Sequence, residues 1–310
     1  MYWIEQTQGG NYRVVKGEMG QEIETVRSTT NEVSAVAVDM ETEVVYWTEN
    51  EFDLGTFEDV STVTNSLGAT LFTVPVITSM AINTQNNRIY WVQFNGTLWS
   101  SDLNGSDIQQ LFVTQTFQTL VALTLDVDNN NLYFIEDFDD GVNEINSKIY
   151  RGDLSGSAPA TVLYEELETG LVPTDGNVTG FVDLSINGSS IYLAGEASST
   201  FTSQILEGNL DGSSNSFSVV YESDPGSSNN PMPQILGLSI DDNFDFVYWI
   251  NYGEGGGISN STDGSIYRGP IDMSMEPELL FEGLELPSRS TVTNGRSKSK
   301  PRKITIGFTF

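Results

Sequence analysis

Tyr46-Trp-Thr-Glu49 is the most complete copy of a short pattern that recurs along this chain of 310 residues. Each copy has a tyrosine followed by a large apolar residue, and successive tyrosines lie 44, 44, 43, 59 and 56 residues apart. The six pairs are Tyr2-Trp3, Tyr46-Trp47, Tyr90-Trp91, Tyr133-Phe134, Tyr192-Leu193 and Tyr248-Trp249. Periods of roughly 40–50 residues with strand-like alternation indicate a radial array of β-sheets.

The segments around each pair complete a repeat of four strands. An alternating apolar strand comes before the pair, as in Leu236–Asp241, and a strand with Ile-Tyr-Arg-Gly follows it at 149–152 and 266–269. A turn of the type Leu-Asp-Gly-Ser, found at 210–213, and a fourth strand, found for example at 279–281, end the repeat. Period-two alternation separated by Asx-Gly turns is typical of antiparallel hairpins. The sequence therefore predicts an all-β fold, a six-bladed β-propeller of four-stranded antiparallel blades.

The first repeat starts at its second strand, so one inner strand is missing at the N-terminus. Ile304–Phe310 aligns with the inner strand Ile235–Ile240. We therefore expect residues 303–310 to join the N-terminal blade and close the ring, which removes an exposed sheet edge. Residues 287–302 would be a basic connector, and a second interpretation is that the strand inserts into a neighbouring subunit. Because blades hide their faces only against each other, residues 1–310 should form a single domain.

The net charge of −30 is unevenly distributed. Residues 1–288 hold all 43 acids and 7 of the 13 bases, a charge of −36, while residues 289–310 carry +6. An acidic body should repel nucleic acid and anionic lipid, and it favours solubility in a salty extracellular setting. The basic segment should lie on an acidic surface, its own or a neighbour's. Its bases are candidates for self-association: Arg289, Arg296, Lys298, Lys300, Arg302 and Lys303.

The chain contains no cysteine and no histidine. Disulfides, thiolate zinc sites, cysteine nucleophiles and histidine bases are therefore excluded. No window approaches the roughly 20 apolar residues of a membrane span, so we expect no membrane insertion. Met1 lies directly against the first strand without a visible signal peptide. Either a leader has been removed or the chain starts inside a longer one, and we expect an extracellular or cell-surface location.

The Tyr46–Glu49 motif, the Ile-Tyr-Arg-Gly strands and the Leu-Asp-Gly-Ser turns together resemble the YWTD propellers of the low-density lipoprotein receptor family and nidogen. The resemblance spans nearly the whole chain and implies an extracellular propeller that acts as a binding module. The acid of the motif is kept in three repeats and replaced in the other three. The residues at this position are Glu5, Glu49, Gln93, Glu136, Gly195 and Asn251. The cysteine-rich modules that usually flank such propellers do not occur in this chain.

Loops that join the second to the third strand, and one blade to the next, share one face of the ring and include the longest loops. Glu165–Thr179 and Glu222–Gln234 are two of them. Long loops on a rigid scaffold are common binding sites, so we expect a protein or glycan partner on this face. Five Asn-x-Ser/Thr triplets in predicted loops or turns are candidates for glycosylation. They are Asn95, Asn104, Asn177, Asn187 and Asn260.

The loop Glu136–Glu144 gathers five carboxylates, and hard oxygen ligands of this kind suit calcium. Asp137, Asp139 and Asp140 are the candidate ligands, with a solvated acidic loop as the alternative. No catalytic residue can be assigned, and we predict a non-catalytic extracellular module for protein or glycan binding or adhesion. The first alternative is a structural subunit of an extracellular fibre or surface assembly. The second is a calcium-dependent hydrolase similar to six-bladed lactonases.

Overall fold

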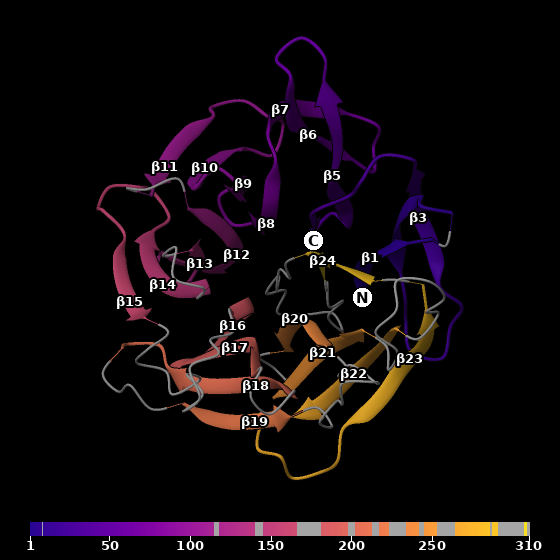
Figure 1. Ribbon diagram of the computed structural model, residues 1–310, viewed down its shortest axis with the longest axis vertical. Coiled ribbons are helices and arrows are strands. Elements are labelled where there is room, and N and C mark those ends of the chain that lie inside the picture. The colour runs from indigo at the N-terminus through magenta and orange to yellow at the C-terminus, as the bar shows by residue number, and fades with distance from the viewer. Residues whose placement is uncertain are drawn as a thin grey trace.

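Six β-sheets surround a central axis, and they form a six-bladed β-propeller of antiparallel blades (Figure 1). The predicted fold class is confirmed. The computed structural model describes residues 1–7, 9–114, 118–139, 145–165, 181–197, 202–212, 217–222, 234–241, 245–252, 264–285, 287–290 and 307–308. Within these residues every regular element is a strand.

Blades 2 to 6 each consist of four strands that are consecutive in sequence and in space. Blade 2 contains β4 (Val36–Asp39), β5 (Val44–Asp53), β6 (Glu58–Asn65) and β7 (Thr70–Pro75). Blade 3 contains β8 (Ile77–Asn83), β9 (Arg88–Gln93), β10 (Thr97–Asp102) and β11 (Gln109–Val113). Blade 4 contains β12 (Thr119–Asp126), β13 (Asn131–Asp139), β14 (Ile145–Asp153) and β15 (Thr161–Glu165). Blade 5 contains β16 (Phe181–Asn187), β17 (Ser190–Ala197), β18 (Thr202–Asn209) and β19 (Ser218–Glu222). Blade 6 contains β20 (Gln234–Asp241), β21 (Phe246–Tyr252), β22 (Gly264–Pro270) and β23 (Glu278–Leu284).

Blade 1 joins strands from both ends of the chain. It contains β1 (Tyr2–Gln6), β2 (Tyr12–Lys16), β3 (Glu24–Thr29), β24 (Pro287–Ser290) and β25 (Gly307–Phe308), in the order β25-β24-β1-β2-β3. The C-terminal part of the chain therefore closes the ring, and β25 joins the N-terminal blade, as predicted. The strand that pairs with β1 differs from the prediction. It is β24, from the start of the expected connector 287–302, and not the segment 303–310 (Figure 1).

The position of β24 follows from the connectivity of the other blades. Each inner strand comes directly after the outer strand of the preceding blade, and β24 follows β23 in the same way, because short connections between adjacent strands are preferred. The register is also that of the other blades. Glu5 pairs with Pro287, just as Gln93 pairs with Ile77 in blade 3. The segment that aligns with Ile235–Ile240 contains β25, which is the fifth strand of this sheet and pairs with β24.

The Tyr-Trp pairs explain why the core is shared among all blades. Neighbouring side chains on a strand point to opposite faces, so each pair contributes to two interfaces. Tyr46 packs in the cluster that contains Trp91 of blade 3, whereas Trp47 packs in the cluster that contains Tyr2 of blade 1. Both Trp3 and Trp91 are fully buried. Large aromatic side chains buried between neighbouring blades favour a ring that folds as one unit.

The glycine of the Leu-Asn-Gly-Ser turn is required at a contact between blades. Gly105 has φ +81°, a conformation that side chains other than glycine rarely adopt. A Cβ atom there would lie 2.7 Å from the carbonyl oxygen of Leu71 in blade 2. Gly156, in the corresponding turn of blade 4, has φ +67° and lies equally close to Leu111 of blade 3. The turn motif therefore allows blades 3 and 4 to approach the preceding blade, and Gly212 does the same for blade 5 against Leu163 of blade 4.

Candidate interaction surface on blade 2

Five of the six blade interfaces are closed by an aromatic ring from the outer strand of one blade. A β-bulge in that strand turns the ring onto the next blade. We call this contact the aromatic lock. Such aromatic pairs add about 0.5–1.5 kcal/mol to stability, beyond the contribution of the apolar area that they bury. The pairs and their centroid distances are Phe72–Trp91 (4.6 Å), Phe112–Phe134 (4.8 Å), Tyr164–Phe217 (5.0 Å), Tyr221–Trp249 (4.7 Å) and Phe281–Trp3 (5.3 Å).

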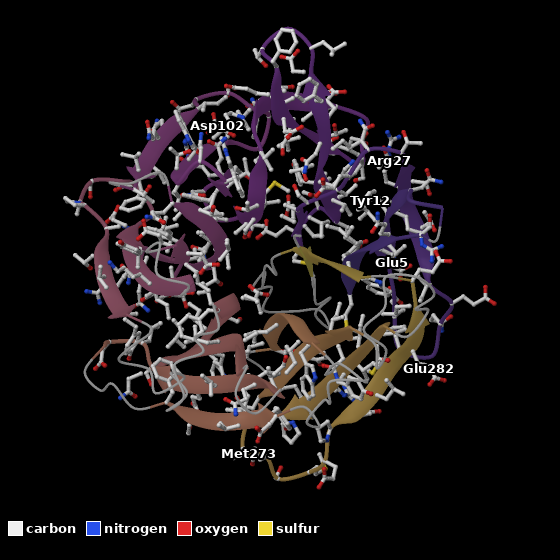
Figure 2. The ribbon with its side chains drawn as sticks, viewed as in Figure 1. Glu5, Tyr12, Arg27, Asp102, Met273 and Glu282 are labelled. Atoms are coloured by element: carbon white, nitrogen blue, oxygen red, sulfur yellow. The ribbon has the colours of Figure 1, made fainter. Side chains whose placement is uncertain are left out.

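The interface between blades 1 and 2 has an arginine in place of the ring. Arg27 follows the bulge of β3 and forms an ion pair of 2.9 Å with Glu49 of blade 2 (Figure 2). The same carboxylate accepts hydrogen bonds from the indole N–H of Trp47 at 3.0 Å and from the hydroxyl of Thr29 at 3.1 Å. We call these contacts of Glu49 the polar clasp. The polar clasp takes the place of the aromatic lock at this interface only.

A polar groove of about 510 Å³ lies between the two blades. Arg27 forms part of one side, while Glu49, Glu51 and Thr62 of the β5–β6 hairpin form part of the other. The Arg27 side chain is 45% exposed, which places the clasp at the water boundary. The groove can therefore take up polar or charged groups from outside.

The β5–β6 hairpin continues from this groove and projects beyond the outline of the ring (Figure 1). Its turn is held by Asp53. The carboxylate accepts hydrogen bonds from the Gly55 amide at 2.8 Å and the Thr56 hydroxyl at 3.0 Å, and the Asp53 carbonyl accepts the Phe57 amide at 2.8 Å. The hydrogen bond from the Gly55 amide, with that from Thr56, lowers the pKa of Asp53 below its usual value. The turn is thus ordered by its own polar contacts.

Three large apolar side chains on this turn face the solvent. The exposed fractions are 53% for Phe52, 76% for Leu54 and 74% for Phe57. The two rings meet edge to face at 6.4 Å. Phe57 has φ +59°, which is unfavourable for a bulky side chain. We call Phe52, Leu54 and Phe57 the hairpin tip. Ordered apolar groups that are exposed together often mark an interaction site.

Carboxylates surround the hairpin tip. Residues 44–65 contain five acids and no base. Glu51, Glu58 and Asp59 form no ion pair with any residue that the structure describes. The hairpin tip is therefore an apolar surface that is surrounded by negative charge.

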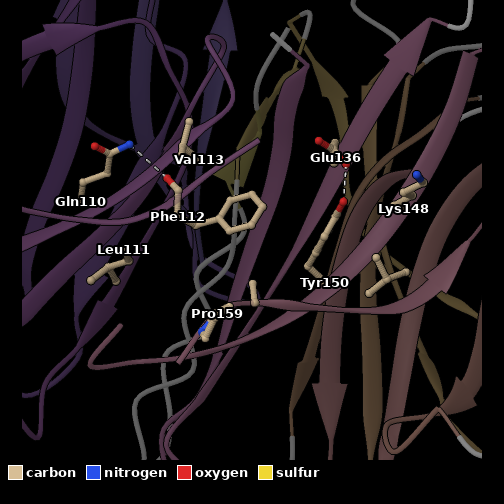
Figure 3. Close-up of a pocket in the computed structure, with 10 residues that line it drawn as sticks. Gln110, Leu111, Phe112, Val113, Glu136, Lys148, Tyr150 and Pro159 are labelled. Carbon is tan, nitrogen blue, oxygen red and sulfur yellow. Dashed lines mark hydrogen bonds between the residues drawn. The ribbon is translucent and has the colours of Figure 1, made fainter. Parts of the chain in front are cut away.

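A larger groove, of about 770 Å³, lies between blades 3 and 4 (Figure 3). Its walls include Phe112, Tyr150 and Val162. Phe112 belongs to the aromatic lock, and the hydroxyl of Tyr150 donates a hydrogen bond of 2.6 Å to Glu136. These side chains already serve the contact between blades, so the groove is a weaker candidate for a binding site.

The acids of the Tyr-Trp motif act in similar clasps. Glu5 is fully buried and accepts hydrogen bonds from the Trp3 indole at 2.7 Å and from Arg13 at 2.6 Å. In blade 3, glutamine replaces the acid, and the buried indole N–H of Trp91 has no hydrogen-bond partner among the described residues. The motif acids therefore have a structural role.

The structure places two of the three candidate calcium ligands. Asp137 and Asp139 lie at the end of β13, and Asp137 accepts a hydrogen bond of 2.5 Å from Ser147. Asp140 lies outside the described residues. No group of three acidic side chains is arranged to hold a metal in the part of the chain that the structure describes. Calcium binding stays a prediction.

The other predicted site residues are also only partly placed. Asn95 and Asn104 lie in exposed turns and Asn187 is half-buried at a tight turn, whereas Asn177 and Asn260 fall outside the described ranges. Among the basic candidates, the backbone of Arg289 belongs to β24. Arg296, Lys298, Lys300, Arg302 and Lys303 lie outside the described residues, as do most of the predicted long loops.

Sequence reasoning missed the hairpin tip. The signal was Phe52-Asp-Leu-Gly-Thr-Phe57, a turn sequence with three large apolar residues where polar ones are usual. The hairpin joins the second and third strands of its blade. It therefore belongs to the set of loops for which we expected a partner.

Comparisons with known proteins support the fold. No family model matches the sequence, and no curated protein sequence matches it. A chain in the crystal structure of a nidogen/laminin complex is similar, with a TM-score of 0.62 and 15% identity over 94% of this chain and 96% of that one. A putative TolB from Agrobacterium tumefaciens has a TM-score of 0.57 and 14% identity over 88% and 89%. An oligogalacturonate lyase in complex with manganese has a TM-score of 0.54 and 11% identity over 94% and 74%.

These similarities show a propeller fold that is found in proteins with different functions. The nidogen likeness agrees with the resemblance seen in the sequence at the level of the fold. No helix with the length and hydropathy of a membrane span occurs in the described ranges.

Proposed function

We propose that the protein is a non-catalytic extracellular binding module that holds a protein partner through the hairpin tip of blade 2. The observation that carries this proposal is the exposure of Phe52, Leu54 and Phe57 on one ordered turn. Folding of the ring does not require three exposed apolar groups, and Phe57 adopts a costly backbone conformation. Buried aromatic anchors dominate the binding energy of many protein interfaces.

The chemistry of the tip favours a protein over a glycan. Its three side chains carry no hydrogen-bonding group, and apolar and aromatic anchors of this kind supply much of the binding energy of protein interfaces. The extracellular setting is supported by the acidic composition and by the likeness to nidogen.

A phage-displayed random peptide library, panned on the immobilised protein, tests the proposal. Enriched peptides are then measured against a hairpin variant, Phe52→Thr/Leu54→Ser/Phe57→Asn. The control is Met273→Asn/Met275→Ser, because Met273 and Met275 are 56% and 62% exposed and Met273 has φ +54°. We expect the control to bind like the wild type and the hairpin variant to bind about tenfold more weakly or worse. Equal binding to all three proteins, or no enrichment, would overturn the proposal.

A further inference from the structure

The β5–β6 hairpin links the groove between blades 1 and 2 to the hairpin tip. Glu49 pairs with Thr62, Glu51 with Val60 and Asp53 with Glu58 across β5 and β6. Side chains of alternate pairs share a face, so Glu49, Glu51 and Asp53 lie on the groove side of the hairpin, and Phe52 lies on the other side. A strand rises about 3.3 Å per residue, which puts the tip about 10 Å from Glu51. A single partner can therefore contact both.

The groove already holds one guanidinium. Arg27 enters it from blade 1 and uses the carboxylate of Glu49. Glu51 lines the same groove, is exposed and has no ion-pair partner in the described part of the chain. A second cation beside Glu51 would meet a carboxylate and the Thr62 hydroxyl within a polar cavity.

The charge around the tip restricts the partner further. Glu51, Glu58 and Asp59 lie beside the hairpin tip, and the whole chain carries a net charge of −30. An acidic partner would be repelled, and a basic one would be attracted over roughly a screening length of 8 Å at physiological ionic strength.

The arginine also makes a wall of this groove polar and charged. At the other five interfaces an aromatic ring fills the equivalent place. An aromatic ring at the place of Arg27 would add stability. The interface that has no such ring is the one next to the exposed hairpin tip. Local departures from a stabilising pattern are expected where a binding site is formed.

We infer that the partner of the hairpin tip presents an apolar socket bordered by lysine or arginine, and that one of these cations enters the groove between blades 1 and 2 beside Glu51. This inference rests on the proposed function, since it specifies the chemistry of the same partner.

Four synthetic peptides of equal length test the inference. Two peptides are apolar, with Leu and Trp, and two are polar, with Ser and Gly. Within each pair, one peptide is basic, with Lys and Arg, and the other is acidic, with Asp and Glu. Fluorescence polarisation measures the binding of each peptide to the protein. We expect the apolar basic peptide to bind most tightly, and its affinity to fall with added salt. Glu51→Lys/Glu58→Lys should weaken it about tenfold or more. Glu22→Lys/Glu282→Lys changes the net charge equally at exposed sites away from the hairpin and should have a much smaller effect.

The outcomes separate the inference from the proposed function. If apolar acidic peptides bind as tightly, or if panned peptides depend on the tip but contain no Lys or Arg, the inference fails and the proposed function stands. If basic peptides without apolar residues bind equally well, both fail. Phosphatidylcholine vesicles provide a further probe. Loss of vesicle binding in the hairpin variant, without any preference among the peptides, would show that the tip inserts into lipid and would overturn the inference.

Discussion

Blade 1 meets blade 6 on one side and blade 2 on the other, and the two interfaces differ at one equivalent position. Phe281 of blade 6 packs on Trp3, with ring centroids 5.3 Å apart. Arg27 of blade 1 takes the corresponding place toward blade 2 and pairs with Glu49. The first contact is buried and apolar, and the second is polar and half open to water.

The interface with blade 6 also contains an ion pair and a close approach of the backbone. Arg13 pairs with Glu5 at 2.6 Å and with Glu285 at 3.5 Å, so it spans the two blades. A Cβ at Gly17 of blade 1 would lie 2.8 Å from the Phe281 ring of blade 6. β1 to β3 are joined to blade 2 by the chain itself, but only non-covalent contacts hold them to blade 6 and β24. We therefore expect the interface with blade 6 to contribute more to stability than the interface with blade 2, where the chain itself joins the blades.

The largest expected effect tests this difference directly. Phe281→Ala should lower the free energy of unfolding by about 3–5 kcal/mol, because it empties a packed aromatic site. Arg27→Ala should cost about 0–1 kcal/mol, since an exposed ion pair contributes little. Urea unfolding curves of both variants give the two values. Similar losses in the two variants would show that the interfaces are equally important for stability.

A graft of the aromatic lock should have the next largest effect. Arg27→Phe combined with Glu49→Gln copies the arrangement of Phe72, Trp91 and Gln93 onto blades 1 and 2. The new ring would stack on Trp47 and fill the groove. We expect a gain of about 1 kcal/mol in the free energy of unfolding, measured in urea. The apolar basic peptide should also bind more weakly. A destabilised double variant would mean that the backbone of this interface cannot accept the ring.

The fold could be predicted because its cause is periodic. The Tyr-Trp pair must recur where each second strand meets two neighbours, so the spacing of Tyr46 and Tyr90 already gives the blade. The strand that closes the ring was harder to identify. β24 has the sequence Pro-Ser-Arg-Ser, without the apolar alternation that marks the other inner strands, and its place follows from connectivity.

The binding surface could not be predicted from the repeat. The role of Arg27 depends on its equivalence to Phe72, which becomes visible only when the bulge of each outer strand is placed against the next blade. The exposure of Phe57 depends on a turn geometry that Asp53 imposes. Both are departures from the periodic pattern, and a search for the pattern does not detect them.

The pH dependence of stability should reveal the buried carboxylate at the interface of blades 6 and 1. Burial raises the pKa of Glu5 above its ordinary value of 4.5, even though Trp3 and Arg13 donate hydrogen bonds to it. Between these two pKa values the folded protein holds a proton that the unfolded chain has released, so stability falls as the pH rises through this window. Glu5→Gln removes the effect. With rising pH, the free energy of unfolding of the wild type should fall relative to that of the variant. Parallel plots of unfolding free energy against pH for the two proteins would contradict this prediction.

The smallest expected change in stability concerns the hairpin tip. Phe57→Asn removes a ring that is 74% exposed, so little burial is lost. Asparagine also tolerates the left-handed backbone better than phenylalanine, which relieves about 1 kcal/mol of strain. The melting temperature should therefore stay the same or rise slightly, while binding of the tip-dependent peptides falls. Met273→Asn places the same residue in the same backbone conformation, at φ +54°, and should raise stability similarly without any loss of binding. A clear drop in melting temperature for Phe57→Asn alone would mean that the hairpin tip supports the ring, and the division between a stabilising and a binding side of blade 1 would not hold.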